Sequence, residues 1–375
     1  MDFGLTETQE LLRKSARAFL AERSKPAYVR AMAEDERGYG EDFWRDIAGL
    51  GWSGLLVPEQ HGGAGLAFAD MTVLLEEWGA SLAPGPLVET AVLAADVIAR
   101  FGDDRQKREC LPRLAAGELV VAPAVTDALG HEPGPTGTAV MASLRRGTWR
   151  LNGHKMFVSY AKSAGAYLVS ARREGSGEPA VFLVPRDGVG ESAITPLLSA
   201  SGRSTCAVDF RDLPLPAGAR LGGDEDGGAV LARLNALGAA ARALQMAGAA
   251  RRVLEITVQY VSNRRQFGRA VGSFQAIQHK LADMALMLQG ARHTAYRAAW
   301  ELSEGRPATR ETAIAKIAMN EALSRICSMA HQAHGAIGFT WEYDLHLYTR
   351  RAIAWRAEFG DTPSHRETLA AEMGL

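Results

Sequence analysis

Residues 260–284, YVSNRRQFGRAVGSFQAIQHKLADM, join two long helical segments and do most to decide the fold. The segment before them, 229–262, and the segment that ends at 304 are rich in alanine and leucine, which favour helix. A third segment of the same kind, 311–333, follows the breaker Gly305-Arg306-Pro307. Three helices of this length predict a helical bundle in the last part of the chain.

The first third of the chain also has helical periodicity. Thr6 followed by Gln9 resembles a capping box at the start of a helix. Gly51 is expected to end a later helix, and further helices are expected over residues 70–78 and 88–101. The N-terminal part is therefore predicted to be α-helical.

Between residues 119 and 221 the pattern changes to short β-rich runs separated by Gly, Pro and Asp. This spacing is typical of an antiparallel barrel or sandwich. Gly147, which follows two arginines, and Asn152-Gly153 are expected to form hairpin turns.

These segments together predict a multidomain α+β fold. We expect an N-terminal α-helical domain over 1–118, a middle antiparallel β domain over 119–222, and a C-terminal four-helix bundle over 223–375. A chain of 375 residues is long enough for two or three such packed domains.

The composition is that of a globular protein, with 47% hydrophobic and 23% charged residues. A net charge of −1 argues against a nucleic-acid partner, because phosphate binding needs clustered, uncompensated cations. No segment approaches the roughly 20 uninterrupted apolar residues that span a bilayer, and the first ten residues lack a signal-peptide pattern. We therefore expect no membrane partner and a cytoplasmic location.

The residues that most often bind metals are not arranged as a metal site. Cys110, Cys206 and Cys327 lie far apart in the sequence and are expected to be reduced thiols. His331 and His334 share a helix face, but no carboxylate stands at a suitable spacing from them. We expect no metal.

Three segments, in order across nearly the whole chain, resemble the acyl-CoA dehydrogenase family. Residues 260–284 are similar to its R-x-x-F-G … F-Q … L-A-x-M segment, and 332–352 (QAHGAIGFTWEYDLHLYTRRA) to its Q-x-x-G-G-x-G-[FY]-T-x-E segment. WRDIAGLGWSGLLVPEQHGGAG and LPRLAAGE look like its N-terminal domain. The resemblance implies that family's fold and FAD as the cofactor.

A flavin ring needs an aromatic wall and donors at its polar edge. The resemblance assigns the wall to Phe157 and the edge hydroxyl to Ser159, in the stretch that follows Lys155, and it retains Thr126. The rest of the family's diphosphate loop, Gly-Ser-Asp, is missing from residues 126–131 (TDALGH). Considered alone, Phe157 would more ordinarily be a core residue and Ser159 an edge-strand residue.

The same resemblance places five residues at the nucleotide end of a flavin that is held mainly by a neighbouring subunit. These residues are Arg264, Gln266, Phe267, Gln332 and Gly335. A helix end that is capped by Gly268, with an arginine near its last carbonyls, would also explain the first of them, and the two interpretations are compatible. A shared site implies an oligomer, with a dimer of dimers expected.

The catalytic base is where the chain departs from the family. In most members a Glu precedes Gly-Thr near the C-terminus, but here Phe359-Gly360-Asp361 stand in that register, and a minority position on the first bundle helix holds Gly238. Neither phenylalanine nor glycine can accept a proton. Glu358 and Asp361 are nearby carboxylates that could substitute, although acids on a surface helix are usually only solvated.

We therefore expect FAD-dependent α,β-dehydrogenation of an acyl-CoA by an oligomer whose second, related subunit supplies the base. The segments TWEYDLHLYTRRA and FGDTPSHRE resemble the actinobacterial type that degrades sterols and cyclic substrates, and electron-transfer flavoprotein is the expected acceptor. Two alternatives stay open: a catalytically silent subunit that stabilises an active paralogue, and an oxidase or monooxygenase-like reaction on the same fold.

Overall fold

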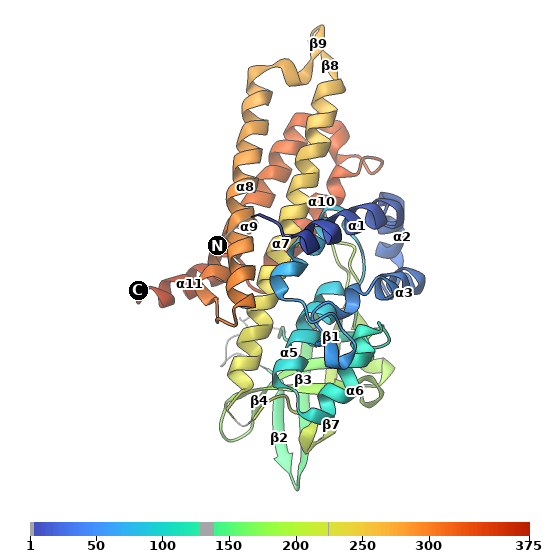
Figure 1. Cartoon of the computed structure of the whole chain (residues 1–375), viewed down its shortest axis with the longest axis vertical. Helices are drawn as coiled ribbons and strands as arrows, with labels where there is room; N and C mark the ends of the chain where they lie inside the picture. Colours follow the sequence, from blue (N-terminus) through green and yellow to red (C-terminus); the bar gives the residue numbers. More distant parts are fainter. Residues whose placement is uncertain (1–3, 128–138, 224) are drawn as a thin grey trace.

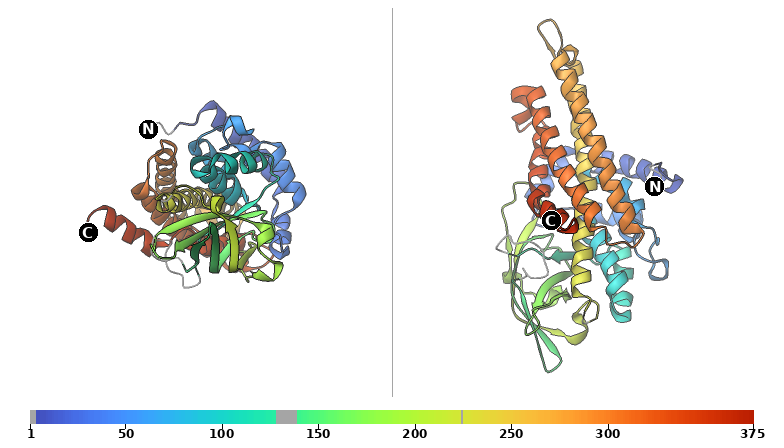
Figure 2. Two further views of the ribbon diagram at one scale, coloured as in Figure 1. Left: turned by 90° about the horizontal axis from the view of Figure 1, so that it is seen from below. Right: turned by 90° about the vertical axis from the view of Figure 1, so that its left-hand side faces the viewer.

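The computed structural model of the protein describes residues 4–127, 139–223 and 225–375. Helices form the two ends of the chain, and a β-sheet lies between them in sequence (Figure 1). The sheet occupies one end of the molecule, while the long C-terminal helices run from beside it to the opposite end (Figure 2). The predicted α–β–α order is confirmed.

The N-terminal part is helical, as expected. Its elements are α1 (Glu7–Arg23), α2 (Pro26–Glu34), α3 (Glu41–Gly49), η1 (Trp52–Gly54), η2 (Glu59–His61), η3 (Phe68–Met71), α4 (Thr72–Ala80), η4 (Leu87–Ala94), α5 (Ala95–Phe101) and α6 (Asp104–Ala115). Thr6 and Gln9 form the predicted capping box, because each side chain accepts from the other's backbone N–H. Gly51 adopts a φ of +76° directly after α3 and turns the chain out of the helix, as predicted.

The helix expected over 88–101 is divided into two parts. Its first half, η4, is π-helical and fully buried, and α5 continues it as ordinary α-helix. Glu89 on η4 is only 3% exposed and faces the interior. Wide helical turns of this kind concentrate at functional sites because they redirect side chains.

The middle part is a seven-stranded sheet, in the order β1-β4-β2-β3-β7-β6 with β5 beside β4. The strands are β1 (Val121–Ala124), β2 (Met141–Arg145), β3 (Thr148–Ser159), β4 (Ala166–Arg173), β5 (Pro179–Pro185), β6 (Ile194–Pro196) and β7 (Thr205–Pro216). Most neighbours are antiparallel, as expected, but β4 pairs in parallel with both β1 and β2.

One of the two predicted hairpin turns is confirmed and the other is wrong. Arg146 and Gly147 both have positive φ and connect β2 to β3, as a tight hairpin turn requires. Asn152-Gly153 lies inside β3, where the pairing with β7 shifts register and then continues. Gly153 adopts a φ of +133° at this β-bulge, a conformation that glycine allows. A β-bulge favours the same residue types as a turn, which is why the two were confused.

The C-terminal part is the predicted helical bundle. It contains α7 (Gly227–Asn263), the hairpin of β8 (Arg265–Gln266) and β9 (Arg269–Ala270), η8 (Val271–Ser273), α8 (Gln275–Ser303), α9 (Thr309–His334), η9 (Gly335–Phe339), α10 (Leu345–Ala357) and α11 (Thr362–Glu372). The α7 helix also crosses α4 at very short range, because a Cβ on Gly248 would lie 1.8 Å from the Glu76 carbonyl oxygen. Only glycine permits this approach.

Two apolar cores hold the parts together. The larger core joins the N-terminal helices to the bundle and reaches β1, and the smaller core lies within the sheet. The domain limits 1–118, 119–222 and 223–375 stay a prediction. They fall in the connections between α6 and β1 and between η7 (Ala217–Ala219) and α7.

Candidate active site

An aromatic side chain stands out from the sheet at the position expected for the flavin wall. Phe157 is 60% exposed, between the fully buried Lys155 and the buried Val158. It sits at a bulge of β3 with φ +55°, a conformation that costs a bulky residue energy and is mostly kept where function needs it. The exposure excludes the alternative that Phe157 is a core residue, while Ser159, at the end of the same strand, is half-buried.

A buried ion pair fixes the chain beside this wall. Lys155 Nζ donates to Asp127 Oδ1 at 2.7 Å and to Ser170 Oγ at 2.9 Å. The Met156 amide donates to the Thr126 carbonyl oxygen at 2.9 Å. Thr126 is therefore held against β3, next to Phe157.

The pairing of Asp127 and Ser170 with Lys155 could not be predicted from the sequence. A lysine in a strand with an aspartate in the preceding segment gives no signal of contact, since only the sheet brings them together. Burial lowers the pKa of Lys155, against the opposing effect of Asp127. Residues 128–131, the remainder of the expected diphosphate loop, lie outside the described residues.

The residues assigned to the nucleotide end lie far from the wall. Arg264 caps α7, and Gln266 and Phe267 form the β8–β9 hairpin, at the end of the bundle opposite the sheet (Figures 1 and 2). All three are exposed, and Phe267 is 93% exposed. One chain therefore cannot bring these residues and Phe157 to the same flavin.

Gln332 and Gly335 lie at the same end of the bundle as Arg264. Both are exposed at the C-terminus of α9, where Gly335 takes a φ of +68° and Gln332 accepts from Lys280 Nζ. Tyr260, on the last turn of α7, stacks on His334 with ring centroids 4.3 Å apart. The five expected nucleotide-side residues thus come from two neighbouring segments.

The two positions where the family places its base meet in space, although they lie 121 residues apart. A Cβ on Gly238 would stand 2.4 Å from Phe359 Cδ1, so the Phe359 ring lies directly against the α7 backbone. Phe359 adopts φ +56° in the connection between α10 and α11. An aromatic ring occupies the space that a carboxylate from either position would use.

Glu358 is adjacent to this ring but is bound on both sides by arginines. Arg203 donates to its two oxygens at 2.6 and 2.8 Å, and Arg242 Nε donates to Oε2 at 2.6 Å. Glu89 accepts from both arginines, at 2.7 and 2.6 Å, which closes a four-residue ionic cluster. Although burial opposes ionisation, the two arginines lower the pKa of Glu358 to about 2. A base needs a pKa nearer the working pH, so this carboxylate is poorly suited to accept a proton.

The other candidate, Asp361, has a structural partner. Its carboxylate caps α11 and accepts from the Ser364 amide at 3.0 Å and from Ser364 Oγ at 2.6 Å, which lowers its pKa. Lys316 Nζ holds the preceding segment by donating to the carbonyl oxygens of Trp355 and Gly360, both at 2.9 Å. The segment that carries the family's usual base is therefore rigidly anchored but has no free carboxylate among Glu358 and Asp361.

No group of three or more metal-binding side chains occurs among the described residues. His331 and His334 instead contact Thr349 and Tyr343 through their Nε2 atoms, at 2.7 and 3.1 Å. In the part of the chain that the structure describes, no helix is long and apolar enough to cross a membrane.

The fold and the sequence place the chain in a family. Residues 6–118 match the N-terminal domain of acyl-CoA dehydrogenases, and residues 226–374 match the C-terminal domain. The protein belongs to the acyl-CoA dehydrogenase family, whose members are FAD-dependent oxidoreductases.

Three known proteins are similar to this chain over nearly its whole length. The acyl-CoA dehydrogenase IpdE2 of Mycolicibacterium smegmatis is 31% identical over 373 residues, which covers 98% of this chain and 100% of that protein. The ChsE4-ChsE5 complex of Mycobacterium tuberculosis contains a chain with a TM-score of 0.91 and 28% identity, over 100% of this chain and 99% of that one. The FAD complex of PigA has the same fold, with a TM-score of 0.89 and 24% identity over 100% of both chains.

The exposed residues of the sheet fit a flavin ring. Phe157 is an exposed aromatic ring that is not packed into the core of the sheet. Ser159 and Thr126, which carry hydroxyls, belong to the segments beside it. Such a face with nearby donors is what a flat, mostly apolar ring with polar edges requires.

Proposed function

We propose that this chain is one subunit of an FAD-dependent acyl-CoA dehydrogenase that removes hydrogens from Cα and Cβ of an acyl-CoA. A second, related subunit supplies the carboxylate that accepts the α-proton. Electron-transfer flavoprotein is the proposed acceptor, and the similarity to the steroid acyl-CoA dehydrogenase Tcur3481-Tcur3483, at 28% identity, supports a sterol-derived or cyclic acyl group. The two differently named subunits of the ChsE4-ChsE5 complex are a precedent for such a pair.

One observation carries the proposal: the ring of Phe359 rests on Gly238. An α-proton of a thioester is only weakly acidic, so its removal needs a desolvated carboxylate within hydrogen-bond reach. Both positions that could provide it in this chain are filled by an uncharged, aromatic contact. The nearest acid, Glu358, is already neutralised by Arg203 and Arg242.

The chain's own contribution is to bind and orient. Phe157 would support one face of the ring, Ser159 and Thr126 would donate to its edge, and Arg264 of a neighbouring subunit would neutralise the diphosphate. The flavin, when bound, supplies the acceptor for the hydride that leaves Cβ. Residues of the Lys155–Asp127 pair keep Thr126 in place for this role.

The arginine-bound Glu358 also favours a second function, a silent subunit that stabilises an active paralogue. In that case the ionic cluster is only a structural link between η4, the β6–β7 connection and α7. Whether a flavin binds against Phe157 of this chain distinguishes the two functions.

The test is to purify the chain alone and together with a related acyl-CoA dehydrogenase subunit from the same source. We expect the lone chain to show little turnover with acyl-CoA, and the complex to contain flavin and to turn over. Full dehydrogenase turnover by the lone chain with stoichiometric flavin would contradict the proposal.

A substitution in the complex distinguishes an active wall from a silent one. Phe157→Ala should weaken flavin binding by about tenfold, the loss expected for one aromatic stacking contact. Leu144→Ala is the matched control, because Leu144 is 54% exposed on the same sheet but is not part of the wall. Unchanged flavin content and turnover in both variants would show that this chain is the silent member.

A further inference from the structure

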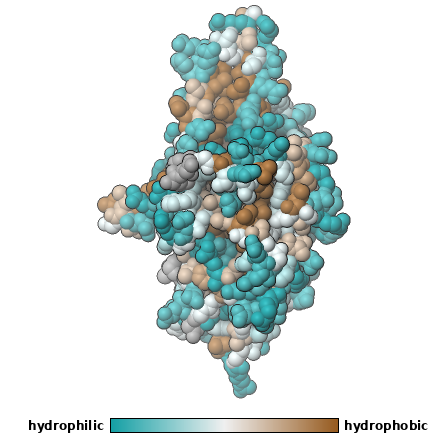
Figure 3. Space-filling model, in the orientation of Figure 1, coloured by the Kyte–Doolittle hydropathy of each residue, from teal (hydrophilic) through white to brown (hydrophobic). Residues whose placement is uncertain are grey.

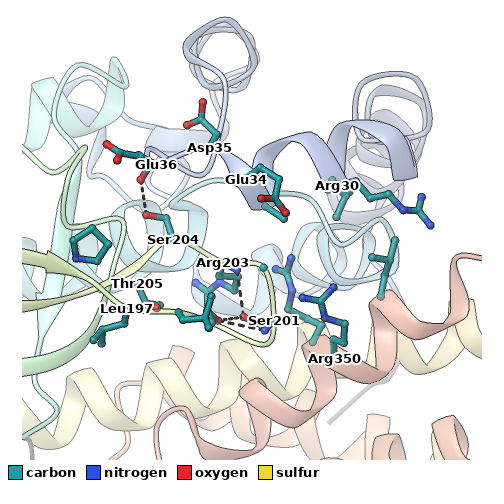
Figure 4. A pocket seen from close by; sticks show the side chains of 18 of the residues that line it. Arg30, Glu34, Asp35, Glu36, Leu197, Ser201, Arg203, Ser204, Thr205 and Arg350 are labelled. Carbon is teal, nitrogen blue, oxygen red and sulfur yellow. Dashed lines mark hydrogen bonds between the residues drawn. The ribbon is translucent and has the colours of Figure 1, made fainter. Parts of the chain in front are cut away.

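A cavity of about 270 Å³, whose lining does not include Phe157, lies where three parts of the chain meet. Its walls come from the C-terminal end of α2, the connection between β6 and β7, and the N-terminal half of α10. Figure 4 shows Arg30 and Glu34 on one side, Ser201 on the connection between β6 and β7, and Arg350 on the helix opposite. Ligand pockets in proteins start at about 300 Å³, so the cavity suits a small ligand or one end of a larger one.

Most charged side chains of this cavity are already paired. Arg30 forms an ion pair with Asp344 at 2.8 Å, and Lys162 forms one with Glu36 at 2.7 Å. Arg203 uses its guanidinium on the ionic cluster, as described above. None of these three cations needs a further partner.

Arg351, on α10, is the exception. Its residue is 5% exposed, and its Nε is buried without a hydrogen-bond partner among the described residues. Its guanidinium lies over the Trp355 ring, 5.6 Å from the ring centroid, and no carboxylate of the described residues forms an ion pair with it. A buried charge of this kind is costly unless something neutralises it.

The neighbouring arginines increase the cost of burying the charge of Arg351. Burial, together with repulsion from Arg203 and Arg242, lowers the pKa of Arg351 to about 10. Arg203 and Arg242 share the carboxylates of Glu89 and Glu358, and within the described residues no carboxylate forms an ion pair with Arg351.

The rest of the lining defines the ligand. Arg350, beside Arg351, donates from Nε to the Ala200 carbonyl oxygen at 2.6 Å and is half-buried at the cavity wall. Val29, Leu82 and Leu347 supply apolar surface in the same cavity. Glu34 and Asp35 also line the cavity, but both are exposed and neither forms an ion pair with the buried guanidinium; Asp35 instead accepts from the amides of Arg37 and Gly38.

We propose that this cavity binds an oxyanion carried on a short apolar chain, a carboxylate or a phosphate monoester, with Arg351 and Arg350 as its cationic partners. Guanidinium groups bind both oxyanions through paired N–H donors, and the aliphatic wall accommodates the chain. The site needs neither the flavin nor the second subunit, so it can be tested independently of the function proposed above.

The test is isothermal titration of the full chain with hexanoate, hexyl phosphate and neutral hexanol. We expect binding of at least one anion at a ratio of one per chain, with the tighter anion identifying the natural head group, and no binding of hexanol. Arg351→Met should weaken the anion by about 30-fold or more, as expected when a buried charge partner is removed. Arg356→Met is the matched control on the same helix, since Arg356 is exposed outside this cavity, and it should bind as the unchanged chain does.

A structural role for Arg351 predicts different results. If Arg351 only supported the fold, Arg351→Met would lower the melting temperature. If Arg351 is an unpaired ligand residue, the variant should melt, without anion, at the same temperature as the unchanged chain or higher. The reason is that an apolar side chain then replaces an unmatched buried charge. Arg350→Met, at the half-buried partner, provides a second variant that should also weaken the anion. The proposal is overturned if neither anion binds the unchanged chain, or if both arginine variants bind it equally well.

Discussion

At the scale of single residues, Phe359 and Gly238 decide how the chain can take part in catalysis. The two positions are alternatives in the family, and the structure shows why: side chains from both would enter the same space. Here one of them carries a ring and the other carries no side chain, so the pair is complementary in size but has no acid. The two positions are therefore filled by a packed contact and are not an empty space.

This packing predicts a strong coupling between the two residues. Gly238→Ala places a Cβ 2.4 Å from the Phe359 ring and should lower the free energy of unfolding by about 1–3 kcal/mol, the usual cost of overpacking. In a Phe359→Ala background the same substitution should cost much less, which gives a coupling energy of about 1 kcal/mol or more in a urea double-mutant cycle. Additive effects of the two substitutions would show that the ring does not rest on the glycine in solution.

Glu358 predicts a dependence of stability on pH. Its pKa is lowered to about 2 in the folded protein from the ordinary value of 4.5, so the folded chain keeps it ionised where the unfolded chain has protonated it. The stabilisation is complete above pH 4.5 and is lost as the pH falls toward 2.

The substitution Glu358→Gln tests this contribution. It should lower the free energy of unfolding at pH 7 by about 3 kcal/mol, because it leaves Arg203 and Arg242 with less negative charge. It should also flatten the fall of stability between pH 4.5 and 2, measured by urea unfolding at each pH. An equally steep fall in the variant would assign the acid sensitivity to other carboxylates.

At the scale of elements, local signals in the sequence identified the long helices and the strands well. Thr6, Gln9 and Gly51 act within a few residues of where they stand, so their effects could be predicted. The pairing of Asn152-Gly153 could not, because a turn and a bulge use the same residues and only the partner strand β7 distinguishes them. The π-helical start of η4 and the ion pairs of Glu89 likewise depend on tertiary contacts.

The same division holds for the candidate site. The family resemblance assigned Phe157 to the flavin and Phe359 and Gly238 to the positions of the base, because these residues belong to recognisable local motifs; these assignments stay predictions. It did not indicate that Glu358 is bound by two arginines, because Arg203 and Arg242 come from segments more than 100 residues away. Asp127 and Ser170 were missed because only the folded sheet brings them to Lys155.

Lys155 on β3 contacts Ser170 on β4 and Asp127 in the segment after β1, and these contacts predict a large effect of one substitution. Lys155→Met leaves the Asp127 carboxylate buried without its partner and should lower the free energy of unfolding by about 3–5 kcal/mol. Lys155→Met with Asp127→Leu should recover most of this loss, since an apolar pair can replace a buried ion pair. Arg150→Met, which breaks the exposed pair with Asp212 in the same sheet, should change the value by less than about 1 kcal/mol, and a similar effect at both sites in urea unfolding would be evidence against the buried pair.

At the scale of the whole molecule, the expected flavin contacts lie at two opposite ends. The sheet carries Phe157, and the β8–β9 hairpin carries Phe267, which is 93% exposed (Figure 1). Figure 3 shows apolar surface on the upper part of the bundle. Val258 on α7 and Leu286 on α8 are exposed apolar residues of the bundle. Exposed apolar surface on long helices is typical of an interface with another chain. A flavin site that used both sets of residues would therefore require two chains.

This arrangement predicts that flavin retention depends on protein concentration. If the wall of one subunit and the hairpin of another hold the same cofactor, dilution that separates the subunits should release flavin, and added FAD should shift the equilibrium back toward the assembly.

Arg264→Glu should release flavin at a higher protein concentration, because it places a negative charge against the diphosphate. Unfolding of the separated chain should not change, since Arg264 is exposed at the hairpin. Arg310→Glu is the matched control, an exposed arginine at the start of α9 and at the other end of the bundle, and it should leave the release curve where it is. The measurement is flavin fluorescence combined with sedimentation velocity over a dilution series, and flavin that stays bound to fully separated chains would rule out a shared site.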